Sequence, residues 1–411
     1  MSTPIQPVFD EVDAIRKEVI AAAALPLNRA ITLPRQAYVD EDYFKAECET
    51  VLKAGWLCVA HVSQVKEPGD FLALELLGEP LVILRDKDGA LRVLSRVCAH
   101  RAMDIMPEGF EFPRSGKTGL LSCPYHRWTY NLDGSLRGCP QMQGADGFER
   151  KDWRLFEFAS SVWHGFVFVN LDGKAAPLSE QYADFGERIA PWRTEDMEIA
   201  IALEWQCEFN WKVMIENWME SYHHLGAHSA TLNPIMPGER TWTETEHPYF
   251  VRAHLPFTEA YATELRRAKE AAGRRAFVSV RGLSRAQETE WGLYLGYPCF
   301  MFLTMPDRVL WYRLLPLSAG RCRLLTTTLV ARESLGLPGL ADIVAAETKL
   351  LRDFHLEDMM VNTAVQRGLN SSKAVRGRLS HLEEPVWLIQ RYLAARAQGR
   401  YPGTSAAEAA E

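Results

Sequence analysis

The sequence predicts an α+β fold with two domains, a small all-β domain followed by a larger domain of mixed helices and strands. Three observations lead to this prediction. The chain has 411 residues, which is too long for one ordinary hydrophobic core. Short β-rich runs separated by turn signals occupy residues 50–165. The remainder alternates strand patterns with helical patterns, one of them long, over residues 166–402.

The composition is that of a folded globular protein, with 47% hydrophobic and 24% charged residues. A net charge of -7 argues against non-specific nucleic-acid binding, and no apolar run is long enough to span a membrane. Residues 19–27 resemble the core of a signal peptide. They follow Asp10, Glu11 and Asp13, where a signal peptide requires positive charge. We therefore expect a cytoplasmic protein with neither a nucleic-acid nor a membrane partner.

The N-terminal residues 1–49 read as a helical segment that packs on the larger domain. Its second helix, at residues 38–52, has Asp40 as its expected N-cap. The β domain that follows contains a strong hairpin signal at residues 86–89 and ends near a buried strand at 161–173.

The larger domain is expected at residues 166–402, and residues 403–411 form a small polar tail that we expect to be disordered. Its predicted helices are 180–192, 210–225, segments within 256–290, 340–366 and 385–398, and its predicted strands are 197–209, 292–304, 308–316 and 322–330.

Two paired motifs in the β domain carry metal-binding residues, Cys98-x-His100 and Cys123-x-x-His126. Two thiolates and two imidazoles are the ligand set of a Rieske [2Fe–2S] cluster. Zinc takes the same donors, but zinc fingers keep the two Cys together and the two His together. Since a cluster only relays electrons, another part of the chain must use them. The sequence has no G-x-G-x-x-G motif, so a nicotinamide cofactor is expected on another protein.

A second group of metal-binding residues lies in residues 210–234 and includes His223, His224 and His228. Two His and one carboxylate form the facial triad that holds non-haem Fe(II) and leaves positions open for O2. On a continuous helix His224 and His228 lie about 40° apart, whereas His223 and His228 lie about 140° apart. Helix geometry therefore favours His224 and His228, unless the helix breaks before His228, as Gly226 permits.

The two motifs, in this order and spacing, resemble the large (α) subunit of Rieske non-haem iron oxygenases, the family of ring-hydroxylating dioxygenases and Rieske monooxygenases. The resemblance extends from about residue 40 to 370. It implies a catalytic domain of helix-grip, START-like fold, with an antiparallel sheet and long helices. It also implies that His223 and His228 bind a mononuclear Fe(II), with Asp358 as the third ligand in preference to Glu357 or Asp353.

Glu220 matches the acidic residue that, in this family, bridges the Rieske domain of one subunit to the iron of the next. We expect it to lie on one helix face with His223. The common residue here is Asp, and Glu occurs in a branch that includes oxygenases of choline-like and carnitine-like quaternary amines. The resemblance implies a homotrimer, or an α3β3 assembly with a small subunit. Arg127 stands where many relatives have Gly, and the loop between His100 and Cys123 is longer than usual.

The function implied by the resemblance is that of a terminal oxygenase component. A ferredoxin, a flavin reductase or both would supply electrons from NAD(P)H, and O2 would hydroxylate a small organic substrate. Aromatic ring hydroxylation is favoured, with hydroxylation of an N- or O-methyl group and demethylation as the alternative. A Rieske ferredoxin-type electron carrier is the alternative from another class, but a carrier needs only about 100 residues. We expect Trp218 to line an apolar pocket, with Asn217 and Tyr222 close to the ligands.

Overall fold

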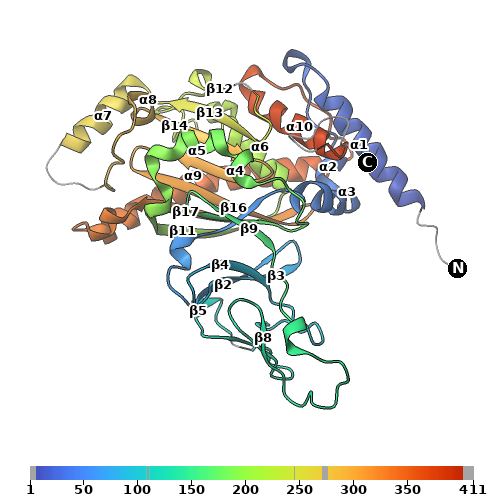
Figure 1. Ribbon diagram of the computed structural model, residues 1–411. Coiled ribbons are helices and arrows are strands. Elements are labelled where there is room, and N and C mark those ends of the chain that lie inside the picture. Colours follow the sequence, from blue (N-terminus) through green and yellow to red (C-terminus); the bar gives the residue numbers. More distant parts are fainter. Residues whose placement is uncertain (1–5, 108, 111, 245, 271–275, 401–411) are drawn as a thin grey trace. The chain divides into compact units, whose positions relative to one another are not determined.

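The computed structural model describes residues 6–107, 109–110, 112–244, 246–270 and 276–400. The predicted tail at 403–411 lies outside the described residues. The chain divides into two structural units, Trp56–Leu178 and a larger unit formed by Met1–Gly55 with Ser179–Glu411. The first is built from strands and the second combines a sheet with helices, so the predicted α+β class is confirmed (Figure 1).

The smaller unit contains three antiparallel sheets. Their strand orders are β4 (Leu91–Ser95), β3 (Glu79–Arg85), β2 (Asp70–Leu76), β5 (Ser115–Lys117); then β6 (Leu121–Ser122), β7 (Thr129–Tyr130), β8 (Leu136–Gly138); then β1 (Leu57–His61), β10 (Phe166–Asn170), β9 (Ala159–Trp163). The predicted hairpin at 86–89 connects β3 to β4. The carboxylate of Asp86 accepts hydrogen bonds from the backbone N–H groups of Asp88 and Ala90, which closes this turn.

The segment 161–173, predicted as one strand, forms parts of two. A turn at His164 and Gly165, both with positive φ, separates β9 from β10. Strand β10 then pairs with both β9 and β1. Because of this pairing, residues beyond 165 belong with the smaller unit, which extends to Leu178.

The larger unit is organised around a seven-stranded antiparallel sheet. The strand order is β11 (Met197–Cys207), β17 (Arg321–Ala331), β16 (Arg308–Ser318), β15 (Phe300–Thr304), β14 (Glu290–Gly296), β13 (Phe250–Pro256) and β12 (Trp242–Thr243). The predicted strand 292–304 is interrupted, because a turn containing Tyr297 and Pro298 separates β14 from β15.

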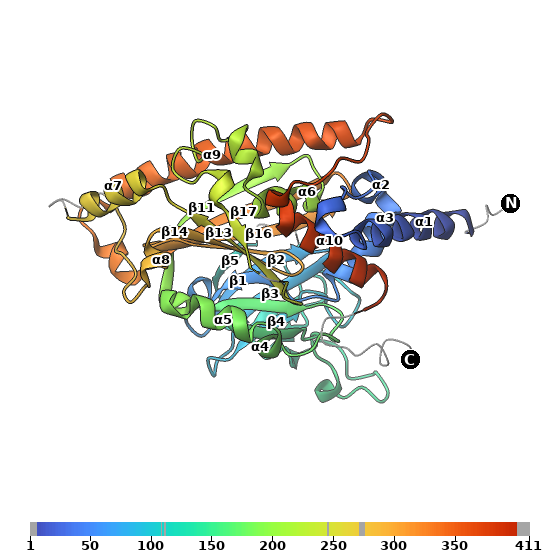
Figure 2. The same ribbon diagram turned by 90° about the horizontal axis from the view of Figure 1, so that it is seen from above.

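Alternate residues of this sheet serve two different faces, since side chains along a strand point to opposite sides. Tyr312 of β16 packs on Trp218 of α6 (Trp211–Met219), and α6 in turn contacts α9 (Leu340–Leu369). Tyr294 of β14 instead stacks on Phe185 of α5 (Ala183–Ile189). Figure 2 shows α9 along one face of the sheet and α5 on the other.

The remaining helices are α1 (Gln6–Ala23), α2 (Gln36–Val39), α3 (Glu41–Glu47), α4 (Leu178–Gln181), α7 (Glu259–Glu270), α8 (Arg285–Glu288) and α10 (Glu384–Ala397). Asp40 caps α3 as predicted, accepting hydrogen bonds from the backbone N–H groups of Asp42 and Tyr43. Helix α1 packs on α10 within the larger unit (Figure 1). Among the described residues, no helix combines the length and apolarity that crossing a membrane requires.

The N-terminal helices hold α6 through buried polar contacts. Lys212 of α6 is fully buried and pairs with Glu47 of α3, with 2.5 Å between Nζ and Oε2. The hydroxyl of Tyr38 donates to the carboxylate of Glu216, 2.7 Å away. The first turns of α6 are therefore fixed to residues more than a hundred positions earlier in the chain. Fixing α6 in this way also positions the residues that follow it.

Candidate metal centres

The two Cys/His motifs of the smaller unit lie side by side, with thiol next to thiol and imidazole next to imidazole. Cys98 and Cys123 are both buried. The rings of His100 and His126 lie with their centroids 4.7 Å apart, and His100 stacks on Trp128 at 4.8 Å. Each motif thus places its thiol beside the thiol of the other motif and its imidazole beside the imidazole of the other, as a shared cluster requires.

The surroundings of these four residues suit an iron–sulfur cluster. Tyr130 places its hydroxyl 3.1 Å from the Sγ of Cys98, and its oxygen accepts a hydrogen bond from the backbone N–H of Ala99. Burial raises the pKa of Tyr130, so the hydroxyl remains a proton donor towards a thiolate. In the described part of the chain, the Nδ1 of His126 is buried without a hydrogen-bond partner. An iron ligated by this nitrogen would satisfy it.

In the larger unit, helix α6 ends earlier than the sequence predicts. It stops at Met219, Glu220 takes an extended conformation with φ -108 and ψ 157, and a 3₁₀ turn follows at Tyr222–Leu225. The predicted helix over 210–225 is therefore wrong after residue 219. Since both His223 and His228 lie beyond its end, the helical angle that favoured His224 does not apply. The rings of His223 and His228 lie 5.0 Å apart.

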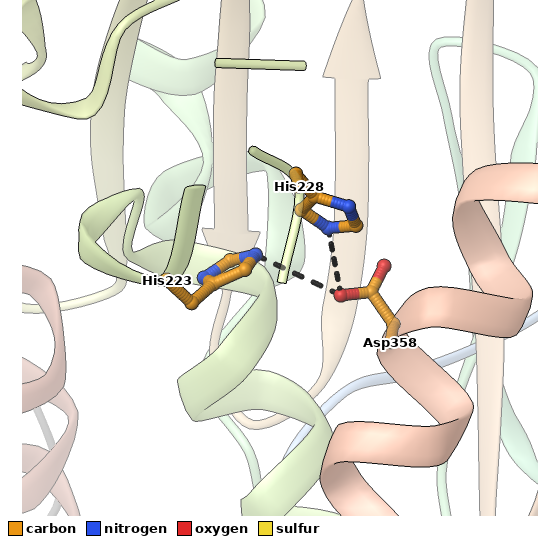
Figure 3. Close-up of side chains that lie close together, drawn as sticks. All are labelled: His223, His228 and Asp358. Atoms are coloured by element: carbon orange, nitrogen blue, oxygen red, sulfur yellow. Dashed lines mark hydrogen bonds and ion pairs between the residues drawn. The ribbon is translucent and has the colours of Figure 1, made fainter. Parts of the chain in front are cut away.

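The third predicted ligand joins this pair from α9. One potential ligand atom from each of His223, His228 and Asp358 lies within 4.8 Å of the other two. Oδ1 of Asp358 is 3.0 Å from Nε2 of His228 and 3.7 Å from Nε2 of His223 (Figure 3). Asp353, the weakest alternative, is instead half-exposed and pairs with Lys349. Two imidazoles and one carboxylate converging on a point are the donor set of a non-haem Fe(II) site.

Each of the two His rings is also held by a second carboxylate. Nδ1 of His223 lies 2.6 Å from Glu220, whose carboxylate also accepts from the backbone N–H of His223 at 3.0 Å. The expected contact with Glu220 is therefore present, although it arises from the extended backbone and not from a shared helix face. Nδ1 of His228 lies 2.6 Å from Glu357, which also accepts from the Thr231 hydroxyl at 2.7 Å. Both rings donate from Nδ1 and turn Nε2 towards Asp358.

Charge and burial suit this site to a cation. Burial alone would raise the pKa of Asp358, but the hydrogen bond with His228 and the electrostatic influence of the neighbouring histidines lower it below its ordinary value. Asp358 therefore stays ionised. His224 lies close by, but its Nδ1 bonds to the backbone carbonyl of Met236 at 3.0 Å. Burial lowers the pKa of His224 to about 4, so it is a neutral neighbour of the ligands.

A pocket opens beside these residues. Trp218 lines it as predicted, together with Trp291, Tyr312, Phe354 and several leucines. Asn217 also lines it, whereas Tyr222 is exposed. His355 also lines the pocket and is not among the site residues predicted from the sequence. One signal was available, since His355 lies three residues before Asp358 and therefore on the same face of α9.

Comparisons with known protein families agree with both centres. Residues 55–150 match the Rieske [2Fe-2S] domain, and residues 181–399, more than half of the chain, match the ring hydroxylating alpha subunit (catalytic domain). The carnitine monooxygenase oxygenase subunit of Acinetobacter pittii is 33% identical over 219 residues, covering 53% of this chain and 57% of that protein. The glycine betaine monooxygenase oxygenase subunit of Pseudomonas aeruginosa is 27% identical over 235 residues, covering 57% of this chain and 52% of that protein.

The chain thus spans only 57% of the length of the carnitine monooxygenase subunit that it matches. Solved structures extend the likeness. A quaternary ammonium Rieske monooxygenase superposes with a TM-score of 0.75 at 25% identity, covering 92% of this chain and 97% of that one. Naphthalene 1,2-dioxygenase from Rhodococcus sp. shares the fold, with a TM-score of 0.73 at 16% identity, covering 94% of this chain and 98% of that one. The chain therefore belongs to the family of ring hydroxylating alpha subunits, with a Rieske [2Fe-2S] domain preceding the catalytic domain.

Proposed function

We propose that this chain is the terminal component of an oxygenase, which uses electrons and O2 to hydroxylate a small organic substrate. One observation carries the proposal. The ligand atoms of His223, His228 and Asp358 lie within 4.8 Å of one another beside a largely apolar pocket, in a chain that also brings two thiols and two imidazoles together. A Rieske-type electron carrier would need only the thiols and imidazoles that hold the cluster, and neither the three residues nor the pocket.

The cofactors of this family are a Rieske [2Fe–2S] cluster and a mononuclear iron. We assign Cys98, His100, Cys123 and His126 to the cluster, and His223, His228 and Asp358 to the iron. The iron supplies the O2 chemistry when it is bound. The donor sets described above support both assignments.

The protein's part is to hold protons and exclude water. Glu220 and Glu357 retain the Nδ1 protons of the two histidines, which leaves both Nε2 lone pairs available to a metal ion. Asp358 contributes a negative charge that offsets part of the charge of Fe(II). Leucine and aromatic side chains on the sheet side of the pocket exclude water from the reacting carbon.

For the substrate, we propose a quaternary ammonium compound. Hydroxylation at one of its N-methyl carbons would give an unstable product that loses formaldehyde. This choice departs from the ring hydroxylation that the sequence favours. It is supported by the relatives that act on carnitine and glycine betaine and by Glu220 in place of Asp. The rings of Trp218, Trp291, Tyr312 and Phe354 offer faces that attract a cationic methylammonium group. Ring hydroxylation of an aromatic compound remains the second candidate, favoured by the same apolar walls.

We further propose that a ferredoxin or flavin reductase delivers electrons from NAD(P)H to the cluster, and that the protein works as a homotrimer. The Rieske cluster of one subunit would then serve the iron of its neighbour, with Glu220 as the bridge. A solved relative is described in terms of inter-subunit electron transfer, which supports this arrangement.

The test compares wild type with His223→Ala in the presence of a surrogate reductase. The variant should keep the visible absorbance of the Rieske cluster and lose substrate-dependent O2 uptake, because only the iron site is altered. A panel of methylated amines and aromatic acids separates the two substrate classes, since N-demethylation releases formaldehyde. Retained turnover in His223→Ala would show that His223 does not bind the iron and would overturn the proposal.

A further inference from the structure

Two polar side chains lie together in the wall of the pocket and have no part in the proposed iron chemistry. The hydroxyl of Tyr312, on β16, is hydrogen-bonded to Nε2 of His355, on α9. Both residues line the pocket and both are fully buried. A buried polar pair that faces a pocket carries a desolvation cost, so a binding role is the natural explanation.

The Tyr312 hydroxyl keeps unused hydrogen-bonding capacity whichever way its proton points. If the hydroxyl donates to Nε2, its oxygen can still accept a hydrogen bond. If His355 carries the proton on Nε2 and donates, then the hydroxyl proton is free to point elsewhere. The Nδ1 of His355 is buried without a partner among the described residues, so the histidine makes no second bond that would fix one tautomer.

The charges around this pair favour an uncharged partner. Burial lowers the pKa of His355 to about 4, so its ring is neutral near pH 7. Asp358 and Glu220 line the same pocket, and no lysine or arginine is found among its lining residues within the described ranges. A substrate carboxylate buried against this part of the wall would find no basic side chain to pair with, and burying an unpaired charge is strongly unfavourable.

We propose that the Tyr312 hydroxyl, held by His355, binds an uncharged hydrogen-bonding group of the substrate, such as an alcohol or an ether, and that the pocket selects against substrates that carry a carboxylate. This deepens the proposed function and rests on it. It also separates this chain from the relatives named for carnitine and glycine betaine, since both of those compounds carry a carboxylate beside the trimethylammonium group.

The experiment measures binding with two pairs of probes, each identical apart from one group. Choline and glycine betaine share a trimethylammonium group, and benzyl alcohol and benzoate share a phenyl ring. Dissociation constants are measured by calorimetry on the holoprotein under nitrogen. In at least one pair the alcohol should bind at least tenfold more tightly than the carboxylate. Burying an unpaired charge costs roughly the free energy of a tenfold difference in affinity, or more.

Tyr312→Phe should weaken alcohol binding by about three- to tenfold, the usual effect of losing one hydrogen bond. His355→Asn, which leaves the phenol in place, should act in the same direction. Tyr294→Phe is the matched control, because Tyr294 stacks on Phe185 on the opposite face of the sheet. In Tyr294→Phe, the ratio of the dissociation constants for carboxylate and alcohol should equal that of wild type.

Tighter binding of a carboxylate in either pair, or equal effects of Tyr312→Phe and Tyr294→Phe, overturns the inference. Rapid demethylation of glycine betaine in preference to choline would leave the oxygenase proposal standing and remove only this inference. An alcohol preference confined to the phenyl pair, without turnover of any amine, would keep the inference and remove the quaternary ammonium proposal.

Discussion

At the scale of single residues, His228 is held on both ring nitrogens by consecutive residues of one helix. Glu357 bonds Nδ1 at 2.6 Å and Asp358 faces Nε2 at 3.0 Å. Neighbouring residues on a helix point about 100° apart, so two adjacent carboxylates can reach opposite sides of a ring that inserts between them. The arrangement fixes the orientation of the His228 ring before any metal binds.

Glu357→Gln should therefore lower the affinity for iron by about 10- to 100-fold, as loss of such a hydrogen-bonded carboxylate does in other metal sites. The measurement is iron retained per chain after dialysis against graded chelator concentrations. The melting temperature of the iron-free protein should be unchanged, which separates orientation of His228 from general stability.

Asp353→Asn is the control on the same helix, since Asp353 is half-exposed and pairs with Lys349. Its iron affinity should match that of wild type. Equal iron retention in Glu357→Gln and Asp353→Asn would show that Glu357 does not position His228.

The four residues proposed to hold the cluster could be picked out because each motif is local in sequence. The role of Glu357 was not, because its contact with His228 spans 129 positions and depends on where α9 packs. The same holds for His355, whose place at the pocket follows from its contact with Tyr312, 43 positions away. The choice between His223 and His224 also required knowledge beyond local geometry, because α6 ends at Met219.

At the scale of elements, α6 carries a buried acid that couples the N-terminal segment to pH. Burial raises the pKa of Glu216 from 4.5 to about 7, against the lowering effect of the hydrogen bond from Tyr38. Between these values the folded protein binds a proton that the unfolded chain has released. The stabilising contribution of this proton is fully present below pH 4.5 and is lost as the pH rises through 7.

Glu216→Gln should remove this dependence, which is worth about 3 kcal/mol between the two limits. Thermal denaturation at pH 5 and pH 8, followed by circular dichroism, should show a smaller fall in midpoint for Glu216→Gln than for wild type. Glu49→Gln is the control, since Glu49 is exposed and pairs with Lys53. Equal falls in the denaturation midpoint of wild type and Glu216→Gln between pH 5 and pH 8 would contradict the raised pKa of Glu216.

The elements themselves were largely predictable, with errors at turns. The seven-stranded sheet and the long helix α9 follow from strongly periodic stretches. The divisions of 161–173 and 292–304 into two strands were missed. Each break is a short reversal, at His164 and Gly165 or at Tyr297 and Pro298, inside a run that is apolar on both sides. Hydrophobic pattern alone does not reveal such a turn.

At the scale of the whole molecule, the proposed trimer makes a prediction about mixed subunits. His100→Ala removes a proposed cluster ligand and His223→Ala removes a proposed iron ligand, so each homotrimer should be inactive. Co-expressed chains should form mixed trimers, in which an intact cluster of one subunit lies next to an intact iron site of its neighbour. If electrons pass between neighbours, these trimers should be active. Every mixed trimer that forms a closed ring has one such pair, so the isolated mixed species should show about a third of wild-type activity per chain.

The mixed species are isolated with two different affinity tags and assayed by substrate-dependent O2 uptake. Activity no greater than that of either parent would contradict transfer between subunits. A mixture of the two purified homotrimers, combined without exchange of chains, is the control and should stay inactive.

The spacing of the proposed iron ligands along the chain also has a consequence for biosynthesis. His228 emerges from the ribosome 130 residues before Asp358, a delay on the order of ten seconds at ordinary rates of translation. The four residues assigned to the cluster, Cys98 to His126, lie within one short stretch and are complete long before that. A nascent chain can therefore receive its iron–sulfur cluster during synthesis, whereas the mononuclear iron can be loaded only after translation has passed Asp358.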